Sequence, residues 1–377
     1  VGNIYSRLTN PTVGVLQARV AGLEGGVAAT ATASGHAAQL TALFALMEPG
    51  AHIVAAKQLY GGTINQLGVR FPRAFGWKTT FADVRKLDEF EQAITPETRA
   101  VWIESLANPG GVVTDIEAIA KIAHDAGVPL LVDNTMATPY LCRPIEHGAD
   151  IVCHSTTKFM SGNGTSIGGI IVDSGKFDWS ASDKFPALTQ PDPGYNGIKF
   201  QETFGELGFT LFGHAVGLRD LGANQQPMNA FLTLLGLETL HLRMERHCEN
   251  ALKVAEFLEG HKRVKWVSYA GLQSSEFHGL AKKYLPRGAG AVFTFGVEGG
   301  YDAGVSVVKN VELFSHLANI GDSRSLIIHP ASTTHSQLSS EARAEAGAAD
   351  DVVRVSIGIE NAKDIIADLD RALSTQS

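Results

Sequence analysis

The sequence predicts an α/β fold, with a large domain built on a mostly parallel sheet and a smaller α+β domain at the C-terminus. In the first half, short β-branched runs alternate with helical patterns, an order typical of parallel strands covered by helices on both faces. The 377 residues leave room for more than one hydrophobic core. A long helical pattern then separates the two halves. We therefore expect a large domain with an N-terminal arm over 1–225, a linking helix over 226–260 and a small domain over 261–377.

The elements of the large domain follow one another at short intervals. The clearest helix covers 115–126, where apolar residues recur with helical spacing and Gly127 follows as a stop. The other predicted helices are 36–47, 60–70 and 140–147. The predicted strands are 52–57, 100–105, 129–135, 150–156 and 168–174.

The rhythm changes after the last of these strands. Residues 183–210 are rich in Pro, Gly and aromatics without a period, so we expect a long loop there. In the small domain, the predicted strands lie near 264–269, 290–297 and 352–357, and the predicted helices near 302–319 and 361–373.

Charge and composition exclude several classes of function. The net charge is −8 and no Lys- or Arg-rich run is present, which excludes a nucleic-acid binder. Polar residues interrupt the best apolar stretch before it reaches the length of a membrane span, so no membrane partner is expected. Because the chain begins with Val1 rather than Met, inside a motif-like stretch, we expect the natural protein to begin earlier.

The cysteines and histidines predict neither disulfides nor a metal site. Cys142, Cys153 and Cys248 are odd in number and lack metal-ligand spacing, which is typical of a reducing, cytoplasmic location. The histidines form no HExxH pair, and His241 and His247 are badly spaced for one helix face.

Four features come at the carboxyl ends of predicted parallel strands, the edge at which open α/β sheets bind ligands: Glu104 to Asn108, Asp133, Ser155 to Lys158, and the loop that leads to Tyr60. Asp133 follows an apolar run and is either a loop or cap carboxylate or the partner of a protonated ring nitrogen. Pyridoxal phosphate (PLP) needs such a partner to act as an electron sink. Lys158 follows the hydroxyls of Ser155 and Thr157 and is either a solvated loop lysine or a desolvated nucleophile and base. The shared edge favours the functional interpretation of both.

Other positions also have two interpretations. Ser34 and Gly35 begin a predicted helix, as a plain N-cap or as a phosphate site. Tyr60 is a packing aromatic or a ring stacked on a cofactor. Arg354, in an apolar strand, pairs with a protein carboxylate or with a substrate carboxylate. The stretch GNGTSIGG over 162–169 does not match a dinucleotide fingerprint, so a Rossmann site is rejected.

Seven motifs occur in an order that resembles the Cys/Met-metabolism family of PLP-dependent enzymes: SGHAA, YGGT, ESLANP, VDNTMATPYLCRP, HSTTKFMSGNG, IGDSRSLIIHPASTTHSQL and VRVSIGIE. They span essentially the whole chain. The resemblance implies PLP as cofactor and the type I fold of PLP-dependent transferases.

The resemblance also implies a role for each matching residue. Lys158 would bond to the cofactor and act as the base, Asp133 would hold the pyridine nitrogen, and Tyr60 would stack on the ring with its hydroxyl near the reacting atoms. The residues that would bind the phosphate are Ser34, Gly35, His36, Ser155 and Thr157, joined by Tyr5 and Arg7 of a neighbouring subunit. Those that would bind the substrate carboxylate are Asn108, Ser325 and Arg354.

Within the family, the N-terminal stretch GNIYSRLTNPT and residues 191–232 resemble the O-acetylhomoserine sulfhydrylase branch. That branch implies conversion of O-acetyl-L-homoserine and sulfide to L-homocysteine and acetate, in a homotetramer whose active sites are shared across a dimer. The nucleophile (sulfide or cysteine) and the acyl group (acetyl or succinyl) stay open. The alternatives are cystathionine γ-synthase, methionine γ-lyase (which commonly has a cysteine in place of Gly62) and, remotely, a non-catalytic PLP-binding protein.

Overall fold

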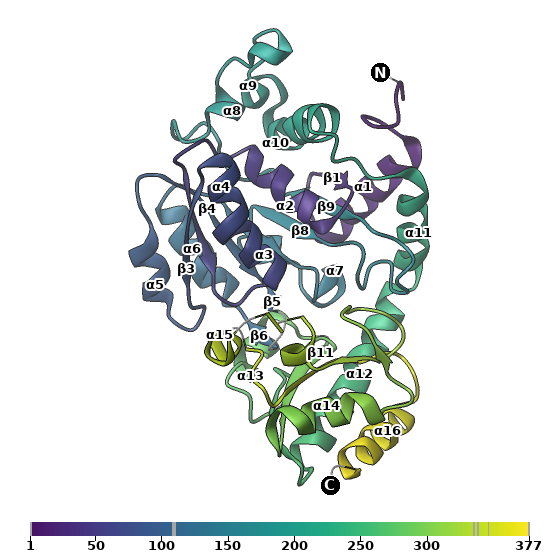
Figure 1. The fold of residues 1–377 in the computed structure, drawn as a ribbon. Coiled ribbons are helices and arrows are strands. Elements are labelled where there is room, and N and C mark those ends of the chain that lie inside the picture. Colours follow the sequence, from purple (N-terminus) through teal and green to yellow (C-terminus); the bar gives the residue numbers. More distant parts are fainter. Residues whose placement is uncertain (1, 108–110, 335, 338, 346, 376–377) are drawn as a thin grey trace. The chain divides into compact units, whose positions relative to one another are not determined.

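The structure is a computed structural model that describes residues 2–107, 111–334, 336–337, 339–345 and 347–375. Asn108, one of the predicted substrate ligands, lies outside these residues. The chain forms two compact units: the first contains Val1–Ser105 and Thr114–Leu237, and the second contains Leu106–Val113 and Glu238–Ser377 (Figure 1).

The core of the first unit is a seven-stranded sheet in the order β1-β9-β8-β7-β4-β2-β3. Its strands are β1 (Ala28–Thr32), β2 (His52–Ala56), β3 (Lys78–Ala82), β4 (Thr98–Glu104), β7 (Leu130–Asp133), β8 (Ile151–His154) and β9 (Gly169–Asp173). β3, β2, β4, β7 and β8 pair in parallel, whereas β9 runs antiparallel between β8 and β1. The parallel strands, β1 among them, therefore end at one edge, which we call the carboxyl edge.

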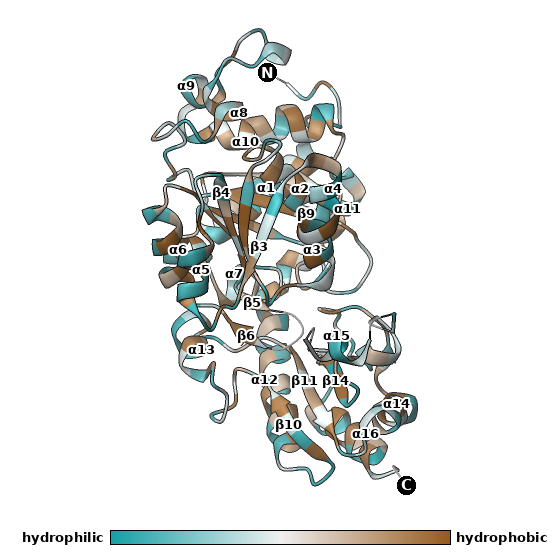
Figure 2. Ribbon diagram, turned by 60° about the vertical axis from the view of Figure 1, so that its left-hand side comes forward, coloured by the Kyte–Doolittle hydropathy of each residue, from teal (hydrophilic) through white to brown (hydrophobic). Residues whose placement is uncertain are grey.

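Helices cover this sheet on both faces. Figure 2 shows α5 (Leu87–Ala93) and α6 (Ile116–Asp125) on one side and α3 (Gly61–Asn65) and α4 (Phe71–Phe75) on the other. Every residue of β2, β8 and β9 is buried, as expected for strands packed on two faces. The predicted mostly parallel sheet is confirmed.

The second unit is built on an antiparallel sheet with one parallel pair, in the order β10-β11-β14-β13-β12. Its strands are β10 (Val264–Ser268), β11 (Val292–Val297), β12 (Ser315–His316), β13 (Leu326–Ile328) and β14 (Val352–Ser356). Its helices are α12 (Leu240–Glu259), α13 (His278–Tyr284), α14 (Gly300–Asn310), α15 (Ser340–Glu345) and α16 (Ala362–Ser374). A short hairpin of β5 (Leu106–Ala107) and β6 (Val112–Val113) also belongs to it.

The prediction of a long loop over 183–210 was wrong. The segment contains α8 (Pro186–Thr189), α9 (Phe200–Phe204) and α10 (Gly208–Phe212). Its aromatics pack on one another, as Phe200 does on Phe204 with ring centroids 6.1 Å apart. Trp179, just before the segment, stacks on Phe209 with ring centroids 5.3 Å apart. Burial of large rings thus orders short helices that have no sequence period.

Three helix predictions were also inexact. The helix expected over 140–147 is α7 (Thr138–Leu141) followed by a 3₁₀ turn that Pro144 begins. The single linking helix is two helices, α11 (Pro227–Glu238) and α12, separated at Thr239. The helix expected to reach 319 ends at Asn310, where the Asp368 carboxylate accepts hydrogen bonds from the amides of residues 312 and 313. None of the helices in the described part of the chain is both long and apolar enough to cross a membrane.

Candidate active site

The structure brings the predicted residues of the first unit to the carboxyl edge. Those residues are Ser34, Gly35 and His36 after β1, Tyr60 after β2, Asp133 at the end of β7, and Ser155, Thr157 and Lys158 after β8. Segments more than 100 residues apart in the chain therefore end next to one another. This edge is where open α/β sheets bind ligands.

Ser34 organises the start of α2 (Gly35–Phe44). Its hydroxyl accepts a hydrogen bond from the Ala37 amide at 3.1 Å, and its carbonyl accepts one from Ala38 at 2.9 Å. The N-cap interpretation is confirmed. The earlier amides, those of Gly35 and His36, have no carbonyl partner within a helix, so they are the groups that an anion can bind there.

The start of α2 lies directly against the loop after β8. A Cβ atom on Gly35 would lie 2.7 Å from Cβ of Ser155 and 3.0 Å from its Cα, so no larger residue fits without movement. The Ser155 amide donates in turn to Thr135 Oγ1 at 2.8 Å. The helix start and the Ser155 hydroxyl are thus held side by side, as a phosphate site requires.

Asp133 is a partly buried residue at the end of β7. Its Oδ1 accepts a hydrogen bond from the Thr135 amide at 2.9 Å. Burial raises the pKa of Asp133, while the bonds from Thr135 and the charges of His154 and His36 oppose that rise. The pKa of His36 is lowered by burial, although the charge of Asp133 counteracts it. Burial thus disfavours the charge on Asp133, and the neighbouring groups on Thr135, His154 and His36 favour it.

Tyr60 lies at the start of α3 with half of its surface exposed. Its backbone amide donates to Glu104 Oε1 at 2.6 Å, and its ring lies 5.7 Å from the His36 ring, centroid to centroid. A Cβ atom on Gly62 would lie 2.5 Å from the Tyr60 ring and 2.7 Å from the His36 ring. Because Gly62 has no side chain, the rings of Tyr60 and His36 fit next to it.

Lys158 is part of a tightly held loop. Its amide donates to the Ser155 carbonyl at 3.3 Å, and its carbonyl accepts from the Gly162 amide at 2.8 Å. The side chain is half-buried, unlike a solvated surface lysine. Thr157 closes the loop, since its hydroxyl contacts the amide and the carbonyl of Gly168 at 3.1 and 3.2 Å. The hydroxyl hydrogen of Thr157 is therefore already used in a hydrogen bond to the Gly168 carbonyl.

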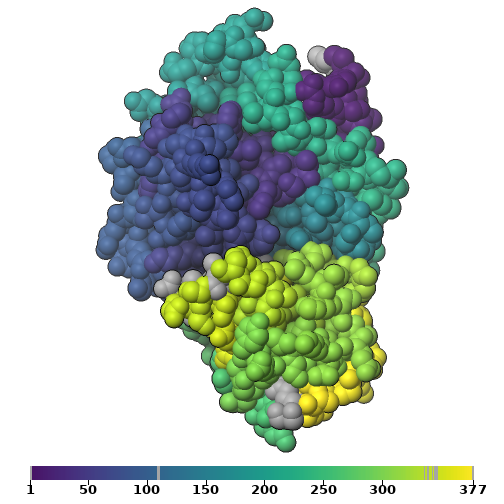
Figure 3. Space-filling model, viewed as in Figure 1, coloured from purple at the N-terminus to yellow at the C-terminus, as the bar shows by residue number. Residues whose placement is uncertain are grey.

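The N-terminal arm lies on the outside of the first unit, coloured purple in Figure 3. Tyr5 is 58% exposed, and the Arg7 guanidinium lies 5.2 Å from the centre of its ring. Arg7 also donates to the Arg219 carbonyl. Within its own chain, the predicted pair therefore packs on itself.

The other predicted substrate ligands belong to the second unit. Ser325 is fully buried; its hydroxyl donates to Glu360 Oε2 at 2.9 Å and accepts from the Gly358 amide at 2.9 Å. Arg354 lies in β14, where its guanidinium is 3.5 Å from the Asn319 carbonyl. In this structure the Ser325 hydroxyl therefore links residues 358 and 360 to β13 within the second unit.

The residues at the carboxyl edge fit PLP. The Gly35–Ser155 contact offers backbone amides and a hydroxyl for a phosphate, Asp133 offers an acceptor for a protonated ring nitrogen, and Lys158 offers an amine. Each of these groups has the chemistry that one part of the cofactor needs.

Comparison with known proteins agrees with this geometry. The family model for Cys/Met metabolism PLP-dependent enzymes matches residues 1–374. The chain belongs to this family. The family is PLP-dependent, so the predicted cofactor and the predicted enzyme class are confirmed.

Relatives within the family are similar over nearly the whole chain. The chain is 52% identical to sulfhydrylase FUB7 of Gibberella moniliformis, over 99% of this chain and 86% of that one. It is 51% identical to the O-acetyl-L-homoserine sulfhydrylase of Leptospira meyeri, with the same coverage. A crystal structure described as an O-acetylhomoserine (thiol)-lyase of Campylobacter jejuni, with a pyridoxyl-lysine phosphate in its chain, superposes with a TM-score of 0.96. It is 41% identical and covers 100% of this chain and 89% of that one, which confirms the type I fold.

A buried polar network beneath the carboxyl edge was not predicted. Glu24, at the end of α1 (Pro11–Glu24), contacts His154 Nε2 at 2.5 Å and the Asn134 amide at 2.9 Å. Asn134 also accepts from the Ser105 hydroxyl at 2.7 Å. The only signal in the sequence was the position of His154 and Asn134 next to site residues, because Glu24 has no motif of its own.

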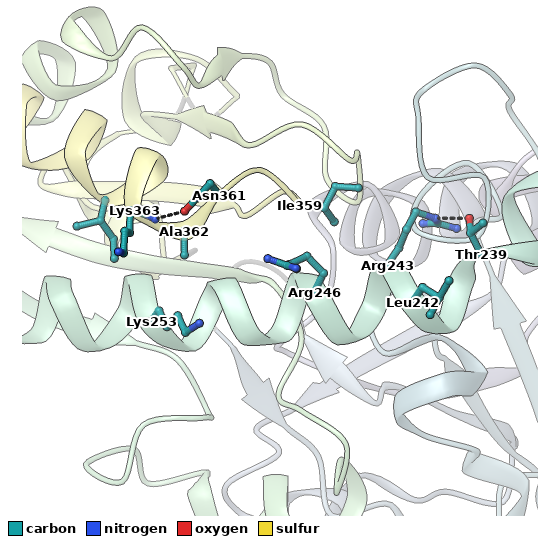
Figure 4. A pocket seen from close by; sticks show the side chains of 10 residues that line it. Thr239, Leu242, Arg243, Arg246, Lys253, Ile359, Asn361, Ala362 and Lys363 are labelled. Atoms are coloured by element: carbon teal, nitrogen blue, oxygen red, sulfur yellow. Dashed lines mark hydrogen bonds between the residues drawn. The ribbon is translucent and has the colours of Figure 1, made fainter.

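The second unit has a groove of about 850 Å³ that the predictions did not anticipate (Figure 4). Among its lining residues are four cations, Arg243, Arg246, Lys253 and Lys363. Glu249 contacts two of them, Lys253 at 2.6 Å and Arg246 at 3.8 Å. These are exposed contacts within one helix, and such pairs carry little energy.

Proposed function

We propose that the chain catalyses a PLP-dependent replacement at Cγ, in which O-acetyl-L-homoserine and sulfide give L-homocysteine and acetate. In this reaction the Cγ–O bond to acetate breaks, the Cγ–S bond forms, and the proton balance is neutral when hydrosulfide is the nucleophile. The relatives named as O-acetyl-L-homoserine sulfhydrylases support this substrate. The observation that carries the proposal is the gathering of Lys158, Asp133 and the start of α2 at one edge of the sheet.

PLP, when bound, supplies an electron sink for the carbanion that forms next to the amino group. We assign the first unit as its binding domain. The start of α2 and Ser155 bind the phosphate, and Asp133 keeps the ring nitrogen protonated. Tyr60 stacks on the ring with its hydroxyl near the reacting atoms.

Lys158 holds the cofactor and moves the proton at the substrate Cα. A positioned general base of this kind typically contributes about 10²–10⁴-fold to the rate. The half-buried loop between Ser155 and Gly168 fixes where the amine can reach. Such orientation is what makes proton transfer efficient.

The substrate carboxylate needs a cationic or donor site. We propose Arg354 for this role, together with Ser325 and Asn108, since a guanidinium binds a carboxylate through two parallel hydrogen bonds. Both the hydroxyl and the backbone amide of Ser325 donate to the Glu360 carboxylate, so one of these bonds would have to be exchanged before Ser325 could bind the substrate.

Gly62 is an observation against the lyase alternative. A cysteine at this position would place its Cβ within 2.7 Å of both the Tyr60 and the His36 rings, so one of them would have to move. Cystathionine γ-synthase, which uses cysteine as the nucleophile, is the competing activity that the experiment below separates.

The test offers the purified protein O-acetyl-L-homoserine with equal sulfide and cysteine, and identifies the product by mass spectrometry. We expect homocysteine as the main product, and slower turnover with O-succinyl-L-homoserine. Cystathionine as the main product would overturn the choice of nucleophile, and 2-oxobutanoate would indicate elimination.

We further propose a homotetramer with active sites shared across a dimer, in which Tyr5 and Arg7 reach the phosphate of a neighbouring subunit. The exposure of Tyr5 supports this assignment. Light scattering tests the tetramer, and an active monomer would contradict it. The three buried, unpaired thiols support a reducing, cytoplasmic location.

A further inference from the structure

Glu24 has a buried carboxylate at the C-terminal end of a helix, where a negative charge is unfavourable. Its side chain has no exposed surface, and it is the last residue of α1, where the helix dipole disfavours an anion. Buried carboxylates are rare unless they are paired. The proposed chemistry at the carboxyl edge does not use this residue directly, so its presence calls for another role.

One oxygen of Glu24 joins two strands. Oε1 accepts hydrogen bonds from His154 Nε2 at 2.5 Å and from Asn134 Nδ2 at 2.9 Å. His154 is the last residue of β8, with 1% of its side chain exposed, and Asn134 directly follows β7. Among the described residues, Glu24 Oε2 and His154 Nδ1 have no hydrogen-bond partner, so these two contacts alone compensate the burial.

These two partners are chain neighbours of the site. Asn134 follows Asp133, and its own amide donates to the Cys153 carbonyl at 2.9 Å. His154 precedes Ser155, which lies against the start of α2. A shift of Glu24 would therefore move the ring-nitrogen partner and the phosphate site together.

We propose that Glu24 is a positioning residue, which fixes the ends of β7 and β8, and with them Asp133 and Ser155, through its hydrogen bonds with Asn134 and His154. This role rests on the proposed function of Asp133. Glu24 touches neither cofactor nor substrate.

The charges around Asp133 support this role. Burial raises the pKa of Asp133, and the groups that lower it again are Thr135 on the following turn, His154 on β8 and His36 on α2. The His36 ring is itself disfavoured as a cation by burial. The Nε2 atom of His154 is held by Glu24 Oε1 at 2.5 Å, so Glu24 fixes where this ring lies. Removing Glu24 therefore releases a ring that acts on Asp133.

The same two strands contain a matched control at their amino ends. Asp150, which precedes β8, is 4% exposed and accepts hydrogen bonds from His124 Nε2 and from the Leu130 amide, both at 2.8 Å. It is also a carboxylate–histidine pair that joins β7 and β8, although His124 is more exposed. Loss of either pair costs stability, but only the Glu24 pair lies beneath the site.

The experiment compares Glu24→Gln with Asp150→Asn in three measurements: thermal midpoint, PLP affinity of the apoprotein, and the pH titration of the visible band of the bound cofactor. Supporting partners typically contribute about 10–100-fold at metal sites, and we expect PLP affinity to fall about tenfold in Glu24→Gln with a displaced titration. Asp150→Asn should lose thermal stability with PLP affinity within about twofold of wild type. Equal PLP affinity and an unchanged titration in both variants would overturn the proposal.

Further variants keep the test decisive if Glu24→Gln does not fold. His154→Gln removes the ring but retains a donor toward Glu24, and we expect the same displaced titration. The double variant Glu24→Gln/His154→Gln should be no worse than the worse single variant, because the two residues act as one unit. Additive losses would indicate independent packing roles and contradict the proposal. All readouts are taken without substrate, so they stay valid if the wild-type protein fails to make homocysteine.

Discussion

The carboxyl edge of the first unit and the groove of the second unit both collect charged side chains, but they hold them differently. At the edge, Glu24 and His154 are almost completely buried, and Asp133 accepts a backbone hydrogen bond. In the groove, about half of the side-chain surface of Arg246 and Lys253 is exposed, and both contact Glu249 on the same helix. The difference shows that charge alone does not make a site: burial with fixed partners orients a group before a ligand arrives.

Lys158→Ala should have the largest effect at the edge. We expect it to abolish the visible band of the bound cofactor and to lower turnover by about 10²-fold or more, because the amine both holds PLP and moves the Cα proton. Absorption spectra and product assays measure this. Lys199→Ala, which removes an exposed lysine paired with Glu202, is the control and should behave as wild type. A coloured, active Lys158→Ala protein would refute the assignment.

Gly35→Val should have the next largest effect. The added side chain would collide with Ser155, whose Cβ lies 2.7 Å from the position of a new Cβ. We expect PLP affinity to fall by about tenfold or more, which corresponds to about 1.4 kcal/mol. Gly22→Ala on α1 is the control, since nothing lies within 4 Å of the added atom there. Unchanged PLP affinity in Gly35→Val would show that the phosphate does not bind at the start of α2.

Asp173 tests burial of a carboxylate away from the carboxyl edge. It ends the antiparallel strand β9, and burial raises its pKa to about 7. Because this pKa lies above the unfolded value, the folded state binds the proton more tightly, so stability falls as the pH rises from about 4 to 7. We expect Asp173→Asn to flatten this slope in denaturant unfolding at pH 5 and pH 8. An unchanged slope would mean that Asp173 stays ionised in the fold.

Glu249→Gln should have the smallest effect. Its carboxylate is exposed and the contacts with Arg246 and Lys253 are solvated, so we expect an unfolding midpoint and an activity that cannot be separated from wild type. A clear loss of activity in Glu249→Gln would show that the groove is more than a solvated surface.

The sequence predicted those parts of the site that depend on local pattern. Asp133 and Lys158 follow apolar strands, and their position at strand ends needs no knowledge of distant contacts. The strand that leads to Ser34 was missed, since β1 reads AATAT and small residues give no strong strand signal. Glu24 could not be found, because its partners lie 110 and 130 residues further along the chain. Such pairings are set by the sheet order, which local periodicity does not contain.

The hairpin of β5 and β6 has a consequence for cutting the protein into pieces. It belongs to the second unit, although the residues on either side of it, Ser105 and Thr114, belong to the first. A gene fragment that stops after residue 237 would therefore carry a strand pair whose packing partners, such as Ser268 and Tyr269 beside Gly111, it no longer encodes. A separately expressed C-terminal fragment would lack the same hairpin. We expect the N-terminal fragment to be recovered in soluble form only when a short linker replaces residues 106–113. We expect the same of the C-terminal fragment only when residues 106–113 are supplied to it as a grafted segment.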